Sequence, residues 1–227
     1  MNTHKRTCTQ TLCRSYTLIA AGLILMAPVA HAAADGWSVV PYIGLSVLDN
    51  QAPQIESEGI ASGQAEVSVD SGFTSGLSVR YDYRDSRWTS EFGWEYRSND
   101  SRITGAADTQ LPAGNYASNT FFLNGRFALS NDQKWTPWIG GGVSWVQEID
   151  LDSETATTER SFSDSGAVGF QLMAGADYDL SDRIYFTSEL RYTSFTGMDL
   201  TQEGGDGSVT DIDYQPLTLA VGIGFRF

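Results

Sequence analysis

Apolar residues recur at every second position along much of the chain from Trp37 to Phe227. This period of two is typical of a β-strand that buries only one face, because successive side chains of a strand point to opposite sides. No stretch in this part sustains the 3.6-residue period of a helix. The alternation is clearest in eight blocks of roughly ten residues, the length of a tilted strand that crosses a bilayer. The blocks begin at Trp37, Ser71, Arg87, Ser118, Trp135, Ser165, Ile184 and Gln215.

The connections between these blocks alternate in length. Three of them, at 84–86, 131–134 and 181–183, are short and made of turn-forming residues (RDS, NDQK and SDR). Four are long and polar, at 49–70, 99–117, 147–164 and 195–214. Short and long connections in turn predict an all-β fold, a closed eight-stranded antiparallel up-and-down transmembrane β-barrel. Its short turns are expected at the periplasmic rim and its long loops outside the cell.

The two faces of the predicted strands differ in bulk. One carries large apolar residues, such as Phe73, Leu77, Phe92, Trp94 and Leu219, and is nearly free of charge. The other carries many glycines together with serine, threonine and charged residues. The lumen of an eight-stranded barrel has room for little more than tightly packed side chains, so the bulky face is expected outside, against lipid. A soluble lipocalin-like barrel would need the opposite arrangement, which this volume argument disfavours.

The first 32 residues differ from the rest of the chain. Lys5, Arg6 and Arg14 precede an apolar stretch of roughly 13 residues, too short for a helix that spans a bilayer. The sequence Ala30-His31-Ala32 then has the small-x-small form of a signal-peptidase site. We therefore predict a secretory signal peptide at 1–32, cleaved after Ala32, and a barrel domain at 33–227.

Removal of this segment makes the protein more acidic. The formal charge changes from -14 to -17, because three basic residues and no acidic ones are lost. Both cysteines and both histidines also lie in the removed part. A strongly acidic exported protein is a poor partner for nucleic acid. The acidic residues gather in the predicted loops, where DLDSE at 150–154 offers carboxylates at alternate positions but lacks the glycine and distant glutamate of a calcium loop.

The face assigned to the lumen carries charges of both signs, six arginines and six carboxylates. Unpaired charge in a confined interior is costly, so balanced charge is expected to form an ion-pair network. The residues predicted for this network are Arg80, Glu91, Glu95, Arg126, Asp177, Glu189 and Arg191. One interpretation is a plug that fills the lumen, and the other is a gate that passes small ions. A wide water-filled porin is excluded, because such channels need about 16 strands.

Three stretches carry a resemblance to a known group of proteins: TPWIGGGVSW at 136–145, GADYDLSDRIYFTSELRY at 175–192, and the terminal GFRF. They resemble the small eight-stranded outer-membrane barrels of Gram-negative bacteria, the superfamily of the OmpA transmembrane domain, the OmpX-like proteins and the opacity-type surface proteins. The resemblance implies a location in the outer membrane, among lipid and lipopolysaccharide. It also implies that the terminal strand, with Phe225 and Phe227, is recognised by the outer-membrane assembly machinery.

The resemblance leaves the function open between two classes. The lipid A deacylases and palmitoyltransferases built on this scaffold use a histidine beside a serine, and the segment 33–227 has no histidine, so no enzyme and no cofactor are expected. The first hypothesis is an envelope-structural role, or a surface adhesion or recognition role through the acidic loops. The alternative is a narrow channel or carrier for small solutes, as in OmpW-like barrels. Those use an apolar lumen, against which the lumen charges argue.

Overall fold

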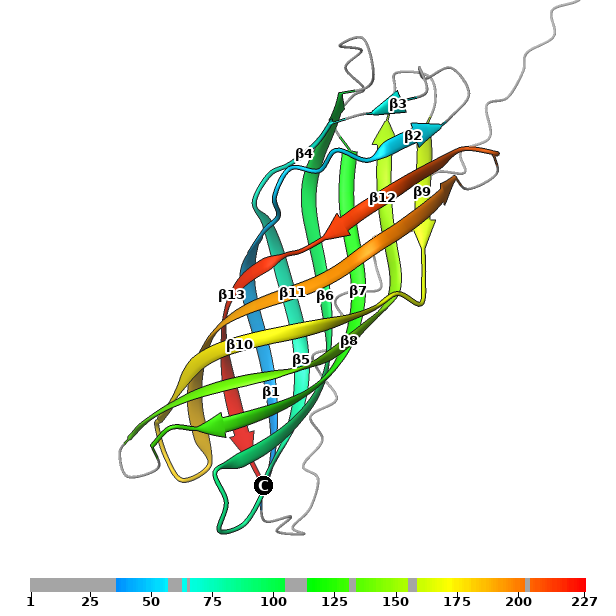
Figure 1. Ribbon diagram of the computed structural model, residues 1–227. Coiled ribbons are helices and arrows are strands. Elements are labelled where there is room, and N and C mark those ends of the chain that lie inside the picture. The colour runs from blue at the N-terminus through cyan, green and yellow to red at the C-terminus, as the bar shows by residue number, and fades with distance from the viewer. Residues whose placement is uncertain are drawn as a thin grey trace, which may run out of the picture. The chain divides into compact units, whose positions relative to one another are not determined.

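The computed structural model describes residues 36–56, 63–64, 66–104, 114–130, 134–154, 159–202 and 205–227. Eight long strands form the main ring of one antiparallel sheet, drawn in Figure 1. They are β1 (Trp37–Val47), β5 (Gly72–Asp82), β6 (Trp88–Thr104), β7 (Gly114–Ala128), β8 (Trp135–Glu154), β10 (Val168–Asp179), β11 (Ile184–Gln202) and β13 (Leu217–Arg226). The predicted signal-peptidase site at Ala30 and Ala32 lies outside the described residues. In the described part of the chain, no helix is long and apolar enough to cross a membrane.

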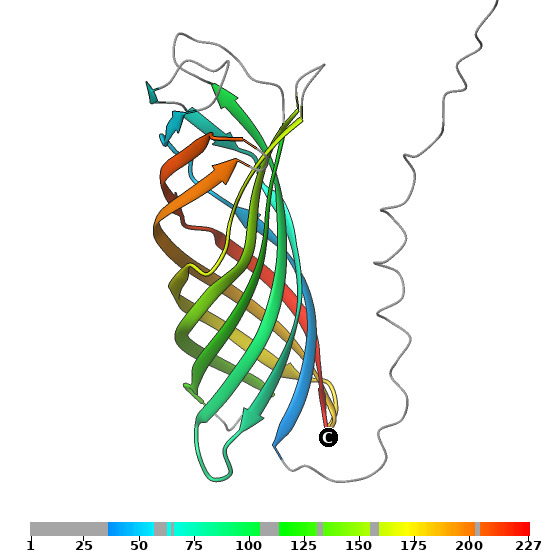
Figure 2. The ribbon, with the colours of Figure 1, turned by 90° about the vertical axis from the view of Figure 1, so that its right-hand side faces the viewer.

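The sheet closes between its first and last long strands. β1 pairs with β13 from Ser38 opposite Arg226 to Val47 opposite Leu217. On its other side β13 pairs with β11, and β10 pairs with both β8 and β11, so the ring is complete. Figure 2 shows β1 and β13 side by side, with the C-terminus at the end of the closing strand. Closure removes the open edges that would otherwise expose unpaired backbone groups to lipid. The predicted eight-stranded barrel is confirmed.

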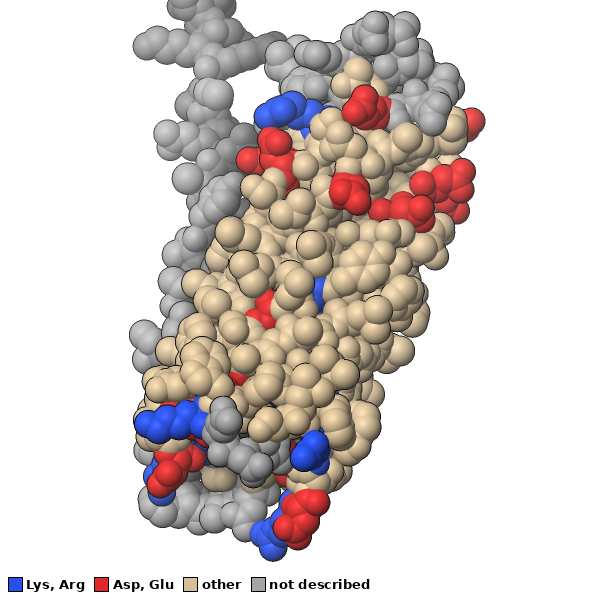
Figure 3. All heavy atoms as spheres, turned by 60° about the vertical axis from the view of Figure 1, so that its left-hand side comes forward, with Lys and Arg blue, Asp and Glu red and all other residues tan. Residues whose placement is uncertain are grey.

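The predicted assignment of faces agrees with the exposure of the side chains. Along β13, Leu219 is 56% exposed whereas its neighbour Ala220 is 3% exposed, and the same alternation runs from Leu217 to Gly224. The middle of the wall in Figure 3 is almost free of charged side chains, which gather at the two ends. This is the outer surface expected of a barrel whose middle lies in hydrocarbon.

The strands are longer at the loop end than the sequence predicted. Strands β6, β7, β8 and β11 continue into segments that were expected to be loops. Three short strands pair with these extensions: β4 (Glu66–Val69) with β6, β9 (Glu159–Asp164) with β8 and β11, and β12 (Ser208–Tyr214) with β11. Two more, β2 (Gln54–Glu56) and β3 (Gly63–Gln64), continue the sheet beyond β12. The acidic stretch 150–154 therefore belongs to strand β8. Polar outward positions concealed these extensions, because a strand outside the lipid needs only one apolar face.

The lumen is also bulkier than expected. Large side chains point inward among the polar ones. The inward-facing glycines have no side chain, and this leaves space for the neighbouring large residues. A Cβ on Gly224 would lie 2.0 Å from the ring of Tyr185, and one on Gly93 would lie 2.3 Å from the ring of Phe122. These glycines are required by the close approach of an aromatic ring, which the sequence pattern alone could not reveal.

We expect Gly224→Val to lower the free energy of unfolding of the barrel by about 1–3 kcal/mol, because its side chain would overlap the Tyr185 ring. Gly125→Ala is the matched control, since a Cβ there meets only Trp88, at 3.8 Å on the outer face. Urea unfolding in detergent micelles, followed by tryptophan fluorescence, measures both. Equal stability of the two variants would contradict the packing of Tyr185 against Gly224.

Candidate functional site

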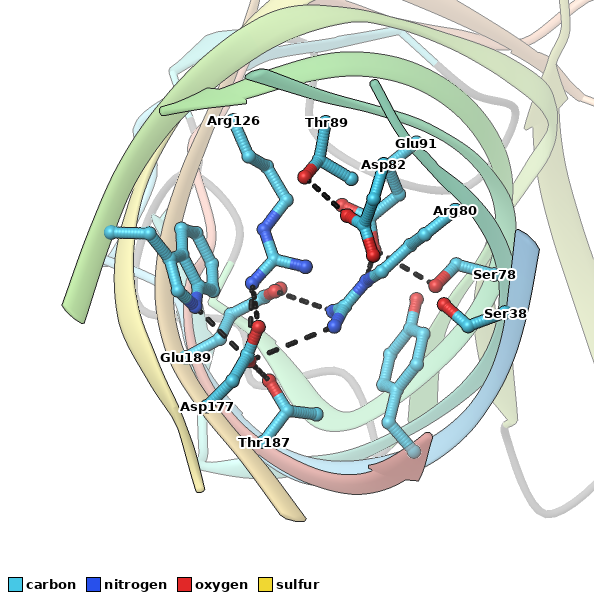
Figure 4. Close-up of polar contacts among 12 residues, drawn as sticks. Ser38, Ser78, Arg80, Asp82, Thr89, Glu91, Arg126, Asp177, Thr187 and Glu189 are labelled. Atoms are coloured by element: carbon cyan, nitrogen blue, oxygen red, sulfur yellow. Dashed lines mark hydrogen bonds and ion pairs between the residues drawn. The ribbon is translucent and has the colours of Figure 1, made fainter. Parts of the chain in front are cut away.

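The lower part of the lumen, towards the short turns, is occupied by ion pairs. Arg80 on β5 donates from Nε to Glu91 on β6 at 2.7 Å, and both side chains are almost fully buried. The Ser78 hydroxyl donates to the same carboxylate oxygen at 2.8 Å. The Arg80 guanidinium also lies 3.8 Å from both Asp177 and Glu189, on the opposite side of the ring, as Figure 4 shows. Arg80 therefore links carboxylates across the lumen.

A second group of charges lies nearer the loop end. Glu95 on β6 accepts from Arg191 on β11 at 2.9 Å and is also paired with Arg97. Arg191 is paired with Glu189 as well, and its guanidinium lies 4.5 Å from the centre of the Phe122 ring. Each carboxylate in this group therefore faces at least one arginine.

A third group lies nearest the periplasmic rim. Arg126 on β7 donates from Nη2 to Asp177 on β10 at 3.1 Å. Asp177 also accepts from the Trp138 indole at 3.1 Å and from the Thr187 hydroxyl at 2.6 Å. The Arg126 guanidinium carbon lies over the Trp138 ring, 3.5 Å from its centre. The structure thus places all seven residues predicted for the network inside the lumen, in three groups that Glu189 and Asp177 connect.

Two features of the lower lumen were absent from the sequence-based prediction. Tyr42, Trp138 and Tyr185 point inward and stack on the arginines, although their bulk suggested the lipid face. Arg87, expected in the lumen, lies exposed in the turn before β6. The inward position of the aromatic residues could have been read from their strand parity, which matches that of the charged residues.

The upper part of the interior, towards the long loops, is apolar. Fourteen buried residues from the strand extensions and short strands pack there in one cluster, which we call the apolar chamber: Leu48, Val67, Val69, Tyr116, Val146, Ile149, Leu151, Phe162, Phe195, Met198, Leu200, Val209, Ile212 and Tyr214. The Tyr214 hydroxyl marks its lower limit, because it accepts from Arg97 at 3.0 Å and contacts Ser118 at 2.9 Å. The expectation that the segments 49–70, 147–164 and 195–214 are polar loops was therefore wrong for the residues of this cluster. Alternating apolar residues in the segments interpreted as loops were the missed signal.

The wall around the apolar chamber is interrupted on one side. β10 pairs with β11 up to Phe170 opposite Ser194, and β9 resumes the pairing only at Ser163 opposite Thr201. Among the described residues, 195–200 of β11 have no ladder partner on β9 or β10. We call this stretch, with residues 165–167 facing it, the seam. The chain bends between β9 and β10 at this level in Figure 1.

The seam has local causes in the backbone. Gly166 and Gly197 both have positive φ, at 89° and 64°, a conformation that strands do not use. The ladder between β11 and β12 shifts register on either side of Met198, as in a β-bulge. The other flank stays attached to β8, because the Val146 amide donates to the Ala167 carbonyl at 2.8 Å. The segment between β9 and β10 therefore stays bonded to β8, while β11 loses its pairing with that segment.

Residues 18–227 match the protein family described as outer membrane protein beta-barrel domain. The chain belongs to this family. Outer membrane protein W of Vibrio cholerae serotype O1 is 20% identical over 214 residues, which cover 91% of this chain and 97% of that protein. This barrel is thus an outer-membrane protein, and its sequence is similar to that of Outer membrane protein W.

Solved structures of outer-membrane barrels share the fold. OprG from Pseudomonas aeruginosa superposes with a TM-score of 0.65 at 18% identity, over 85% of this chain and 96% of that one. AlkL, solved in lipid bilayers, gives a TM-score of 0.50 at 18% identity, over 88% and 94% of the two chains. Since barrels of this membrane keep their short turns in the periplasm, the long loops of this chain lie outside the cell.

Proposed function

We propose that this barrel accepts small apolar molecules at the cell surface and releases them sideways into the membrane. The apolar chamber supports this proposal, because its packed, buried side chains offer an apolar environment to a solute that enters at the loop end. Beneath it, the ion-pair groups occupy the path towards the periplasm. To move from the chamber towards the periplasm, an apolar solute would have to separate these buried ion pairs, which costs several kcal/mol.

The seam is the single observation that carries the proposal. A closed antiparallel wall seals its backbone with hydrogen bonds. Residues 195–200 pair with β12 on one edge but have no ladder partner on β9 or β10 on the other, which lowers the cost of separating β11 from the β9–β10 bend. Phe195, Met198 and Leu200 lie on the chamber side of this stretch and are buried. Side-chain movement there would open the lower edge of the chamber sideways, next to the outward-facing apolar residues Val168 and Phe170 at the top of the lipid-facing wall. The proposal contains no catalytic step, since the segment 33–227 has no histidine to activate a hydroxyl.

A bulky side chain at the seam tests this route. Ala167 packs against the apolar chamber, so Ala167→Trp should fill the seam and reduce uptake of an apolar fluorescent dye by cells that produce the protein. We expect a reduction of about tenfold, towards the rate of cells without the protein, if the route is blocked sterically. Val168→Trp is the matched control, because the neighbouring Val168 is 73% exposed and faces outward.

Unchanged uptake in Ala167→Trp at equal surface expression would contradict the proposal. Discrete ion conductance from the pure parent protein in a planar bilayer would contradict it as well, because the ion-pair groups would then not close the lower lumen.

A second candidate function is recognition at the cell surface. It is favoured by exposed carboxylates at the loop end, including Asp49, Asp199, Asp211 and Asp213. Acidic side chains also gather at the upper end of the face drawn in Figure 3. Acidic loops suit basic partner surfaces or divalent cations shared with lipopolysaccharide phosphates. The Ala167→Trp experiment separates the two candidates, since blocking the seam leaves the loop carboxylates in place.

A further inference from the structure

A cavity of about 240 Å³ opens at the periplasmic mouth of the barrel, at the far end from the apolar chamber. Three arginines line it, Arg87, Arg126 and Arg226, against two carboxylates, Asp82 and Asp177. The volume suits a group of the size of phosphate or a small carboxylate and is below the range of typical drug-sized ligand pockets.

Both carboxylates of this cavity already accept hydrogen bonds from neighbouring side chains. Asp177 accepts from Arg126, Trp138 and Thr187, and Arg80 lies 3.8 Å away, as seen in Figure 4. Asp82 accepts from the Thr89 hydroxyl at 2.6 Å. At the rim, Arg226 is paired with Asp179 at 2.7 Å. Arg126 therefore shares Asp177 with Arg80, and Arg87 is the arginine of the cavity that has no ion pair with a described carboxylate.

The hydrogen-bond donors of Arg126 are only partly satisfied by the described residues. Both of its contacts with Asp177 come from one nitrogen, Nη2, and its Nε has no hydrogen-bond partner among the described residues. Its side chain is 4% exposed and its guanidinium lies over the Trp138 indole. A buried guanidinium with an unpartnered donor is costly unless another acceptor completes it. Arg87, on the cavity wall, forms no ion pair with a described residue.

We propose that this mouth cavity binds an oxyanion, a phosphate or carboxylate group that Arg126 and Arg87 hold together. A guanidinium fixed by stacking presents its donors in a plane, the geometry that oxyanions accept best. The group can come from a free solute in the periplasm or from the headgroup of an inner-leaflet phospholipid. The site includes the ion-pair group of Arg126 and Asp177 and lies at the far end of the barrel from the seam, so the proposal does not depend on the route through the seam.

The test uses the complete barrel in maltoside micelles, with NMR of its tryptophan indole N–H groups at constant ionic strength. Trp138 is the reporter, because its indole donates to Asp177 and lies under Arg126. In one arm inorganic phosphate is added, and in the other the micelles receive short-chain phosphatidylglycerol. We expect a saturable shift of the Trp138 signal. Saturation by phosphate identifies a free anion, and saturation by the lipid alone identifies a headgroup.

Arg87→Gln is the deciding variant, since an exposed side chain without an ion partner can be replaced without harm to folding. We expect it to raise the apparent dissociation constant about three- to fivefold, the effect of losing one exposed charge pair. Arg183→Gln is the control, because it removes the same charge from another turn at this rim that does not line the cavity. Absence of a saturable shift in both arms, or equal weakening by the two variants, would overturn the proposal.

Discussion

Replacing Arg191 with methionine is expected to lower the free energy of unfolding of the barrel by about 3–5 kcal/mol. Arg191 is almost completely buried and is paired with both Glu95 and Glu189. Methionine can occupy the space over the Phe122 ring but carries no charge, so two carboxylates lose a common partner. Urea unfolding of the refolded barrel, followed by tryptophan fluorescence, measures the change.

Two further variants separate lost charge pairing from lost packing. Adding Glu189→Gln to Arg191→Met should recover part of the stability, because one of the stranded charges is then removed. Arg102→Met is the surface control: Arg102 lies 3.0 Å from Asp70, but both side chains are more than half exposed. Its cost should stay below about 1 kcal/mol, since solvent screens an exposed pair. Similar costs at Arg191 and Arg102 would show that the lumen charges do not form a buried network.

Deletion of Phe227 is expected to slow insertion of the barrel far more than it weakens the finished fold. Phe227 contributes one backbone hydrogen bond to closure, from its amide to the Trp37 carbonyl at 3.1 Å, and its side chain is half exposed. Loss of one such bond costs about 1 kcal/mol. If the terminal strand with Phe225 and Phe227 is the segment that the assembly machinery recognises, the rate should fall by about tenfold or more, which is about 1.4 kcal/mol of activation free energy.

The measurement compares insertion into vesicles that contain purified assembly machinery with spontaneous insertion into thin bilayers. Trp88→Ala is the matched control, because Trp88 is a lipid-facing aromatic at the same rim with similar exposure. That variant should lose stability and keep the catalysed rate. A Phe227 deletion that inserts at the parent rate would show that the residue serves only as an anchor in the membrane interface.

Where the sequence-based predictions succeeded, the cause was a strong contrast between neighbouring positions. In LTLAVGIGFRF, bulky residues alternate with small ones, and lipid on one side and a narrow lumen on the other allow only one assignment of faces. The pairing of this strand with β1 then followed from the need to satisfy every backbone group in lipid. The lumen charges were located by the same parity.

The predictions failed where that contrast disappears. Above the membrane, Ile149 and Leu151 alternate with acidic residues in a stretch that is indistinguishable in composition from a polar loop. The apolar chamber exists because such stretches from β8, β11 and β12 meet in one interior, although they are far apart in the chain. Contacts of this kind depend on the register between strands, which no single segment encodes.

The sequence by itself determined the membrane-facing surface, the closure of the ring and the balance of charge in the lumen, because these depend on residue type and strand parity. Only the tertiary structure decided which arginine meets which carboxylate, where Trp138 and Tyr185 fit against glycines, and where the wall loses its pairing at the seam. Those outcomes depend on the stagger of neighbouring strands and on two glycines with positive φ, which act through backbone geometry.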